Sequence, residues 1–574
     1  MEATPSPREY LWKAIDDQIK SLEVSIQELR PLRHRRNELA PISSLPTEVI
    51  GAIFSLLRVP TLDGKPDHRA WLRVAHVCHH WREIALNQPL LWSHLDFTTV
   101  SSAGAAEILA RAKTVPLHLE ANVPFGHWDD ARFRNLQKEL KTHASRIRHL
   151  KLCIEPTQLK KTLNHLISPA PTLEYLFLSC QANKHGSIES IYIPNTFFDG
   201  ATPRLSCLKL EHCNINWMSP LLRGVEHLHI LSYSAPNLSD WLDALDEMPQ
   251  LKTLNLHSSL PTSTIDPAPF DVERTVTLPS LTLLNISGLV RVCGLALAHL
   301  VLPALITLGV HAESYFEDGR DVPDILPHVT RQTYGRHHTQ PLQSVFVRSA
   351  MKWGVEVLAW TVPDINFHAM LSDTVVEFPL RIATPMHSLQ VVIFGDWLPV
   401  TCTEVFDMLR LALPLDGIVT LAVEKPTRLD KQFWLCHAPQ WPLLRCMQLG
   451  SRAASGLVEM LLEDNEGREG PLFPLLTKLV LFDSRLSAPR TLRLCDALMN
   501  RVEQGVPLET LELRTCIASH RAVKLLGEIV TEVLGPEGSY KERALGARSK
   551  WDATARGFFV AHDSSGEDED DIDS

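Results

Sequence analysis

The sequence predicts an α/β fold in which helices at the N-terminus are followed by an irregular array of strand-and-helix repeats. Two observations support this prediction. Up to residue 97, apolar side chains recur mainly three and four residues apart, which is the spacing of amphipathic helices. From residue 147 onward, the pattern Leu-x-x-Leu-x-Leu returns about a dozen times, which indicates short strands that each present leucines on one side.

Composition places the chain among soluble globular proteins and excludes some partners. The 574 residues carry 45% hydrophobic and 21% charged side chains and a formal net charge of -11. No basic stripe stands out, so nucleic acid is not an expected partner. The first residues lack an apolar signal core, so secretion is not expected. The most apolar stretch, 288–305, is interrupted by Arg291 and His299, so no membrane span is expected. The 11 cysteines include no Cys-x-x-Cys pair, which favours reduced thiols and a cytoplasmic or nuclear location.

Residues 1–41 form the first predicted part, an N-terminal helical arm. Its apolar residues follow the a/d spacing of a coiled coil: Trp12, Ile15, Ile19, Leu22, Ile26 and Leu29. Pro31 is expected to end or kink this helix, because proline removes a backbone hydrogen bond. About three heptads are marginal for a free coiled coil. Two interpretations therefore stay open, a weak homodimer through residues 8–30 or an arm that packs on its own protein.

Residues 42–97 form the second predicted part, a set of short helices. Thr47 is a candidate N-cap for the first helix. A second helical run is interrupted at His79 and His80 and ends at Asn87-Gln88-Pro89. So small a unit cannot bury all of its large apolar side chains. The surplus predicts a contact with another protein or with the next domain.

Three separated blocks in this stretch carry a resemblance to a known family. They are L-P-x-E-V-I-x-x-I-F, V-x-x-V-C-x-x-W-R-x-x-A and P-x-L-W, in that order. Together they resemble an F-box, in the form seen in the large F-box families of mushroom-forming fungi. The resemblance covers about a tenth of the chain and departs from compact F-boxes in a longer, more polar loop from Arg58 to Arg69.

The resemblance implies three small helices that dock on the Skp adaptor of a cullin-RING ubiquitin ligase. Pro89 and Trp92 match the closing block, which would tie the domain to the next part of the chain. Carried over by position, the resemblance implies these adaptor-facing residues: Leu45, Pro46, Ile50, Ile53, Phe54, Val77, Cys78 and Trp81.

Residues 98–535 form the third predicted part, an irregular leucine-rich-repeat solenoid. Each Leu-x-Leu is interpreted as a short strand, and the segment between copies as a returning helix or loop. Cys213 and Cys516 fall three residues after the last leucine of their copies, where such repeats place a small polar side chain, so a structural role is expected. The clear copies begin at Leu173, Leu205, Leu251, Leu281, Leu305 and Leu508, and the weaker ones at Ile147, Val225, Leu342, Leu389, Ile418, Leu444 and Leu476.

Three polar excursions interrupt the repeats, and the chain ends in an acidic segment. The excursions cover residues 261–277, 315–340 and 463–470, and insertions of this kind often lie on the binding side of a solenoid. Residues 536–574 form the last predicted part, whose acidic tail has too few apolar residues to fold.

No motif for catalysis, cofactor binding or metal binding is found. The sequence lacks the nucleotide-binding glycine patterns, the Gly-x-Ser-x-Gly nucleophile motif and zinc-ligand spacing. We therefore expect a non-catalytic chain without cofactor. The resemblance implies a substrate-recognition adaptor of a cullin-RING ligase that presents an unidentified client protein. The alternative is a repeat scaffold that recruits no ligase.

Overall fold

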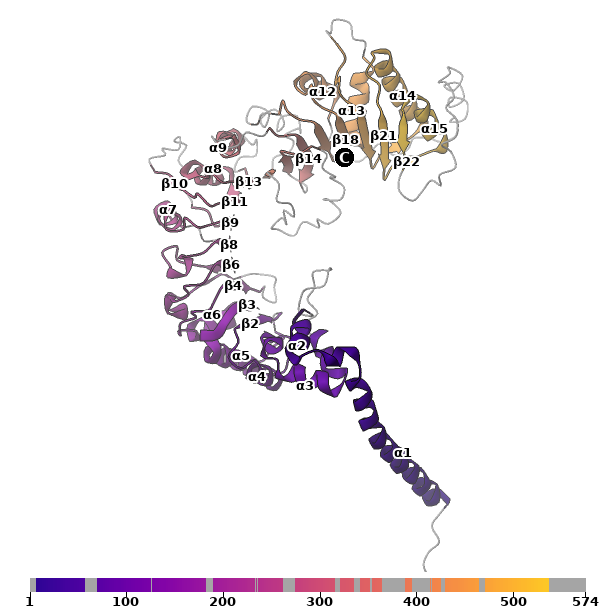
Figure 1. The fold of residues 1–574 in the computed structure, drawn as a ribbon. Helices are drawn as coiled ribbons and strands as arrows, with labels where there is room; N and C mark the ends of the chain where they lie inside the picture. The colour runs from indigo at the N-terminus through magenta and orange to yellow at the C-terminus, as the bar shows by residue number, and fades with distance from the viewer. Residues whose placement is uncertain are drawn as a thin grey trace, which may run out of the picture. The chain divides into compact units, whose positions relative to one another are not determined.

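The computed structural model combines helices with largely parallel sheet, in agreement with the predicted α/β class (Figure 1). It divides into two compact units, Met1–Gly224 and Val225–Ser574. In the described part of the chain, none of the helices has the length and apolar character needed to cross a membrane. The structure describes residues 7–56, 70–124, 126–181, 189–232, 234, 236–261, 274–314, 321–334, 341–350, 354–363, 388–394, 413, 415–424, 429–463 and 470–535.

The first unit begins with helices. Pro31 lies inside the first of them. The helix therefore does not end at this proline, which was one of the two predicted outcomes. The predicted loop from Arg58 to Arg69 lies outside the described residues. The helical elements are α1 (Pro7–Glu38), η1 (Pro41–Ser44), α2 (Thr47–Leu56), η2 (Ala70–His76), α3 (His79–Asn87) and η3 (Pro89–Trp92).

A parallel sheet completes the first unit. Each of its long strands pairs with the next one along the chain, and the register aligns Leu119, Leu150, Leu176 and Leu208 in one buried row. The strands are β1 (His94–Asp96), β2 (Leu117–Asn122), β3 (Ile147–Ile154), β4 (Tyr175–Cys180) and β6 (Cys207–Glu211). The connecting elements are α4 (Ser102–Arg111), α5 (Asp130–His143), η4 (Ala144–Arg146), α6 (Pro156–His165), β5 (Ile191–Tyr192), η5 (Phe197–Gly200), β7 (Cys213–Asn214) and η6 (Pro220–Leu222).

The second unit contains two runs of parallel strands. The first run is β8 (His227–Leu231), β9 (Thr253–His257), β11 (Leu283–Leu289) and β13 (Thr307–Glu313). The second run is β17 (Thr420–Val423), β18 (Cys446–Gly450), β19 (Lys478–Phe482), β21 (Thr510–Arg514) and β23 (Glu532–Leu534). Other elements are α7 (Leu238–Asp246), β10 (Val276–Thr277), α8 (Val290–His299), β12 (Leu300–Val301), α9 (Val322–Tyr334), α12 (Lys431–His437), η7 (Ala438–Gln440), α13 (Ser451–Leu461), β20 (Arg485–Leu486), α14 (Ala488–Glu503), β22 (Ile517–Ala518) and α15 (His520–Ile529).

Between these two runs the strand order reverses. β13 pairs in parallel with β16 (Ser388–Phe394), and β16 pairs antiparallel with β15 (Gly354–Trp360). β15 in turn pairs antiparallel with β14 (Ser344–Ala350), and β14 pairs in parallel with β17. The predicted copies at Leu342 and Leu389 therefore do contain strands, β14 and β16. In the sheet, however, β16 lies next to β13 and β14 lies next to β17, so the strands do not follow their order in the chain. The antiparallel strand β15 has no counterpart among the predicted copies.

Several strands end in the same local conformation. The residue directly after each of β6, β9, β19 and β21 has a left-handed backbone, with φ between 49° and 55°. The residue that comes next is small and buried in all four cases: Cys213, Ser259, Ser484 and Cys516. The Cys516 thiol donates to the carbonyl of Leu481 at 3.2 Å, in agreement with the structural role predicted for it. Cys213 instead contacts the thiol of Cys180, with 3.7 Å between the sulfur atoms.

The predicted excursions are described only in part. Residues 321–334 of the second excursion fall in α9 and its preceding turn, so this stretch is helical and not an open loop. Most of the first excursion, residues 464–469 of the third, and the whole segment 536–574 lie outside the described residues.

Candidate protein-docking site

Helix α2 has two apolar faces that meet different surroundings. Ile50 and Phe54 are 0% and 1% exposed and pack inside the helical region, beside the buried Gly51. The adjacent face carries Val49, Ile53 and Leu56, preceded by Leu45 just before the helix. These four residues are 43%, 39%, 69% and 37% exposed, respectively. Val49, Ile53 and Leu56 follow one another three or four residues apart, so they form one stripe on the helix surface. Leu45 precedes this stripe in extended backbone.

Helix α3 supports the inner face of α2. Cys78 is its N-cap, and the Cys78 sulfur accepts a hydrogen bond from the backbone N–H of Trp81 at 3.5 Å. This contact orients the first turn of α3 so that the Trp81 ring lies against the Phe54 ring, with 5.1 Å between the centroids. The Phe54–Trp81 pair therefore holds α2 in place while its outer stripe stays exposed.

The structure separates the sequence-predicted residues into three groups. Leu45, Pro46, Ile53 and Val77 are exposed in the described part of the chain. Cys78 and Trp81 are half-buried, and Ile50 and Phe54 belong to the interior of the domain. We call Leu45, Val49, Ile53 and Leu56 the docking stripe. Sequence reasoning missed Val49 and Leu56 as surface residues, although their helical spacing from Leu45 and Ile53 was a usable signal.

The closing block joins this helical region to the strands. Trp92 is 6% exposed, and its indole N–H donates to the carbonyl of Ala85 at 2.8 Å. The Arg111 guanidinium, at the end of α4, lies over the Trp92 ring at 4.5 Å from the centroid. Trp92 thus bridges α3 and α4, immediately before β1 begins.

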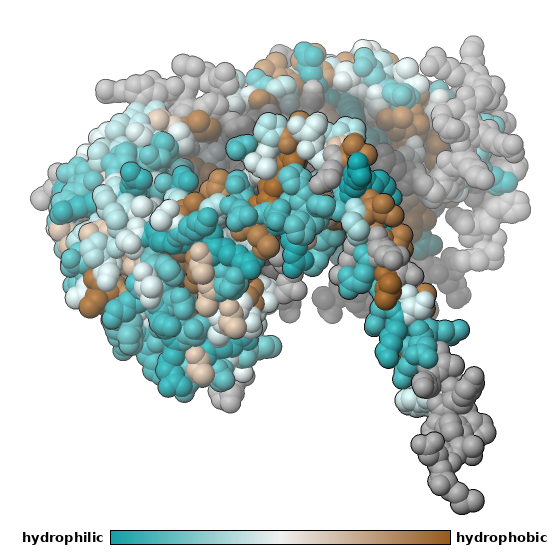
Figure 2. Space-filling view, turned by 60° about the horizontal axis from the view of Figure 1, so that its bottom comes forward, coloured by the Kyte–Doolittle hydropathy of each residue, from teal (hydrophilic) through white to brown (hydrophobic). Residues whose placement is uncertain are grey.

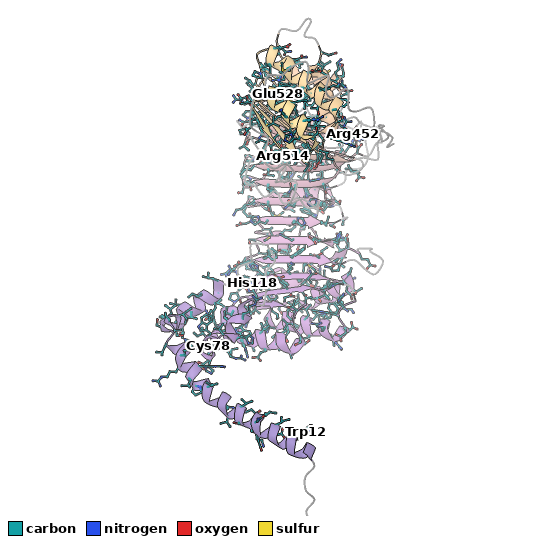
Figure 3. All side chains as sticks on the ribbon, turned by 90° about the vertical axis from the view of Figure 1, so that its right-hand side faces the viewer. Trp12, Cys78, His118, Arg452, Arg514 and Glu528 are labelled. Atoms are coloured by element: carbon teal, nitrogen blue, oxygen red, sulfur yellow. The ribbon has the colours of Figure 1, made fainter. Side chains whose placement is uncertain are left out.

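The strands of the first unit carry an aromatic row on the face opposite their buried leucines. His94, His118, His149 and Tyr175 occupy the same register position on β1 to β4. Their ring centroids are 3.9 Å, 4.1 Å and 5.5 Å apart in that order. Figure 3 labels His118 on this sheet and Cys78 in the helical region. Burial and the neighbouring Arg148 lower the pKa of His149, which favours a neutral ring in the row.

A second row beside it is charged. Asp96 and Glu120 stand at its β1 and β2 positions, and Lys151 and Lys209 at its β3 and β6 positions. Lys151 lies 3.9 Å from the Glu120 carboxylate and 5.8 Å from the centroid of the Phe177 ring. This half-exposed face offers ring surfaces, which are enriched at protein interfaces, and charges of both signs, which can complement the charges of a partner.

Among the described residues, no group of three His, Cys, Asp or Glu side chains is placed to hold a metal ion. The cysteines with shifted pKa values are buried or half-buried, and the pKa of most of them is raised, whereas the hydrogen bond with the Cys213 thiol lowers the pKa of Cys180. Burial raises the pKa of Cys153 to about 11 and also raises that of Cys516. A raised pKa keeps a thiol protonated and unreactive.

Comparison with known proteins assigns the helical region. Residues 42–98 match the F-box-like family model, so the chain carries an F-box-like domain there, one residue longer than predicted. No curated protein matches the chain. A solved structure, "Crystal structure of Rad7 and Elc1 complex in yeast", matches at 13% identity over 94% of this chain and 97% of that chain, with a TM-score of 0.25. A TM-score at that level does not establish a shared fold.

Proposed function

We propose that this chain is a substrate-recognition adaptor of an SCF-type ubiquitin ligase, whose F-box-like domain docks on a Skp-family subunit. The observation that carries the proposal is the docking stripe, which lies within the residues that match the F-box-like family. In this proposal Pro46 and Val77 border the contact, and Ile50, Phe54, Cys78 and Trp81 hold its frame.

The docking stripe is large enough to contribute substantially to binding. The exposed fractions of Leu45, Val49, Ile53 and Leu56 add up to roughly two whole side chains. Removing that surface from water is favourable by about 3 to 6 kcal/mol, from which the entropic costs of association are subtracted. Interfaces of this kind depend on a few apolar anchors surrounded by polar contacts.

We further infer that the strands form an irregular leucine-rich-repeat array that holds the client. The parallel pairing, the aligned leucines and the recurrent left-handed residue after four strands support this inference. The face with the aromatic and charged rows is our candidate for client contact in the first unit. The adaptor would act by proximity, because holding a client near the ligase raises the local concentration of its lysines.

Co-purification with a Skp-family subunit tests the adaptor proposal. We expect the full chain to form a stable complex, and Ile53→Asp to weaken it by about 100-fold or more, since a charge would be buried in an apolar contact. Ile167→Asp is the matched control, because Ile167 is 53% exposed and lies outside the F-box-like domain. Phe54 and Trp81 are unsuitable targets, because their truncation would disturb the fold of the domain.

The outcomes separate the adaptor from a scaffold. A complex that Ile53→Asp loses and Ile167→Asp keeps supports Skp docking, and a cullin that co-purifies supports recruitment of a ligase. A well-folded chain that binds no Skp subunit would overturn the proposal. The Trp92 contacts with Ala85 and Arg111 would then indicate a helical cap on the strands of a repeat scaffold.

A further inference from the structure

Helix α1 carries an apolar stripe that the rest of the described chain does not cover. Its members stay at least 46% exposed although all of them are large and apolar. Figure 2 shows hydrophobic residues set among hydrophilic ones along this helix, and Figure 3 places Trp12 near its start. The stripe consists of Trp12 (69% exposed), Ile15 (48%), Ile19 (47%), Leu22 (63%) and Leu29 (46%).

We propose that this stripe binds the same stripe of a second copy of the chain in a parallel two-stranded coiled coil. In the heptad pattern, Trp12 and Ile19 occupy a positions, and Ile15, Leu22 and Leu29 occupy d positions. The sequence also places Ile26 at an a position. Isoleucine at a combined with leucine at d favours parallel dimers over higher oligomers.

The charges beside the stripe are compatible with the parallel orientation, which the isoleucines at a positions and leucines at d positions favour. Asp16 and Glu23 occupy e positions, and Gln18 occupies a g position. In a parallel pair, e residues face g residues, so Glu23 of one copy meets the neutral Gln18 of the other. In an antiparallel pair, e residues face each other, so Asp16 would meet Glu23 of the second copy, while Arg30, also at an e position, would meet Glu9. Like charges in contact are destabilising.

The coiled coil must end before the F-box-like domain. The next a and d positions are Arg33 and Arg36, which would place like charges of the two copies face to face. The contact from Trp12 to Leu29 is therefore roughly 27 Å long, at about 1.5 Å per residue. Its short length predicts a weak, concentration-dependent dimer.

The far end of α1 is tied to the F-box-like domain. The His34 ring lies edge-on to the His79 ring of α3, with 5.5 Å between their centroids. The Ser43 hydroxyl donates to the carbonyl of Asn37 at 2.7 Å. A parallel dimer therefore places both F-box-like domains at the same end of the coiled coil.

Sedimentation equilibrium of the full chain, from about 1 to about 100 μM, tests the dimer. We expect the mean mass to rise toward twice the chain mass with concentration. Ile19→Asp should raise the dissociation constant by at least about 100-fold, because it places a charge in the apolar contact. Val24→Asp is the matched control. Val24 lies on the same helix and is 58% exposed, but it occupies an f position outside the contact.

Cross-linking tests the orientation. In the parallel pair, Leu22 faces Leu22 of the second copy, so a Leu22→Cys chain should form a disulfide-linked dimer on mild oxidation. Val24→Cys should give no more cross-linked dimer than the parent chain. A monomer at every concentration would overturn the proposal, as would equal effects of Ile19→Asp and Val24→Asp. A dimer that Leu22→Cys does not link would overturn the parallel orientation.

Discussion

Two helical glycines of the second unit should respond in opposite ways to the same substitution. Gly456 lies in α13, and a Cβ there would overlap the carbonyl oxygen of Leu429 and lie 2.9 Å and 3.0 Å from the carbonyl carbon and Cα of Asp430. These are backbone atoms, so no side chain can rotate away to make room. Gly527 lies in α15, and a Cβ there meets no atom within 4 Å.

The expected magnitudes depend on two competing effects. Alanine is favoured over glycine inside a helix by about 1 kcal/mol. At Gly527 nothing opposes this gain, so Gly527→Ala should stabilise the unit by about 0.5 to 1 kcal/mol. At Gly456 the overlap forces α13 away from the start of α12, and such overpacking costs about 1 to 3 kcal/mol or more. Because the overlap is with rigid backbone, this cost should lie in the upper half of the range, so after subtraction of the helix gain Gly456→Ala should be destabilising by about 1 to 2 kcal/mol.

Urea unfolding followed by tryptophan fluorescence measures both effects. Trp434 and Trp441 are 0% and 1% exposed and lie on and just after the α12 segment, so unfolding of this region changes their part of the emission from the chain's 13 tryptophans. With a slope of about 2 kcal/mol per molar urea, Gly456→Ala should lower the midpoint by about 0.5 M or more. Gly527→Ala should leave the midpoint unchanged or raise it. A midpoint for Gly456→Ala at or above that of the parent chain would refute the packing argument.

Three further predictions concern single side chains. Burial lowers the pKa of both His257 and His311 to about 4, from an ordinary 6.5. Between pH 4 and pH 6.5, the unfolded chain therefore binds more protons than the folded chain. The free energy of unfolding should be constant above about pH 7. It should fall as the pH is lowered from 6.5 to 4, by up to about 3 kcal/mol for each histidine. In urea unfolding over that pH range, His311→Gln should reduce the dependence of the free energy of unfolding on pH. An unchanged pH dependence would contradict the lowered pKa of His311. Arg501 is 1% exposed and donates to the carbonyls of Leu472, Phe473 and Leu476. Arg501→Met should cost about 2 kcal/mol in thermal unfolding, whereas the exposed Arg493→Met should change stability by less than about 0.5 kcal/mol. Trp92→Phe should cost about 1 kcal/mol by losing the bond to Ala85, seen as faster proteolysis of the F-box-like domain, with Skp binding unchanged at saturating concentrations.

The positions of the long strands could be predicted because the pattern that forms them is local. Leu176 and Leu178 point to one side of β4, and the equivalent leucines of β3 and β6 align with them in register. Burial of this side fixes the register, since a shift by one residue would expose every leucine. The small residue three positions after the pattern was recognised at Cys213 and Cys516. The serines at the same offset, Ser259 and Ser484, carry the same signal, which the sequence prediction did not use.

The reversed strand order could not be predicted from local pattern. β14 (SVFVRSA) and β16 (SLQVVIF) both contain a continuous apolar run, and neither sequence indicates which neighbouring strand it will pair with. The choice depends on β15, whose antiparallel pairing with both strands is a property of the assembled sheet.

Only Leu45 and Ile53 of the docking stripe were predicted, because local pattern does not determine which face of α2 is buried. Both faces of α2 are apolar, so periodicity alone does not tell Ile50 and Phe54 from Val49 and Ile53. Contact between Phe54 and Trp81, which are distant in sequence, decides which face is buried.

The reversal between β13 and β17 has a consequence for synthesis of the chain. On one side, β13 pairs in the folded sheet with β16, which begins about eighty residues later. That edge of β13 therefore stays unpaired while the ribosome makes the intervening chain. At about 5 to 20 residues per second, the wait is roughly 4 to 16 seconds. During that time a nascent chain could pair β13 with β14, which emerges first and has a similar pattern. Among the described strands of the second unit, β13 is thus one whose folding in the cell depends on protection of an unfinished sheet edge.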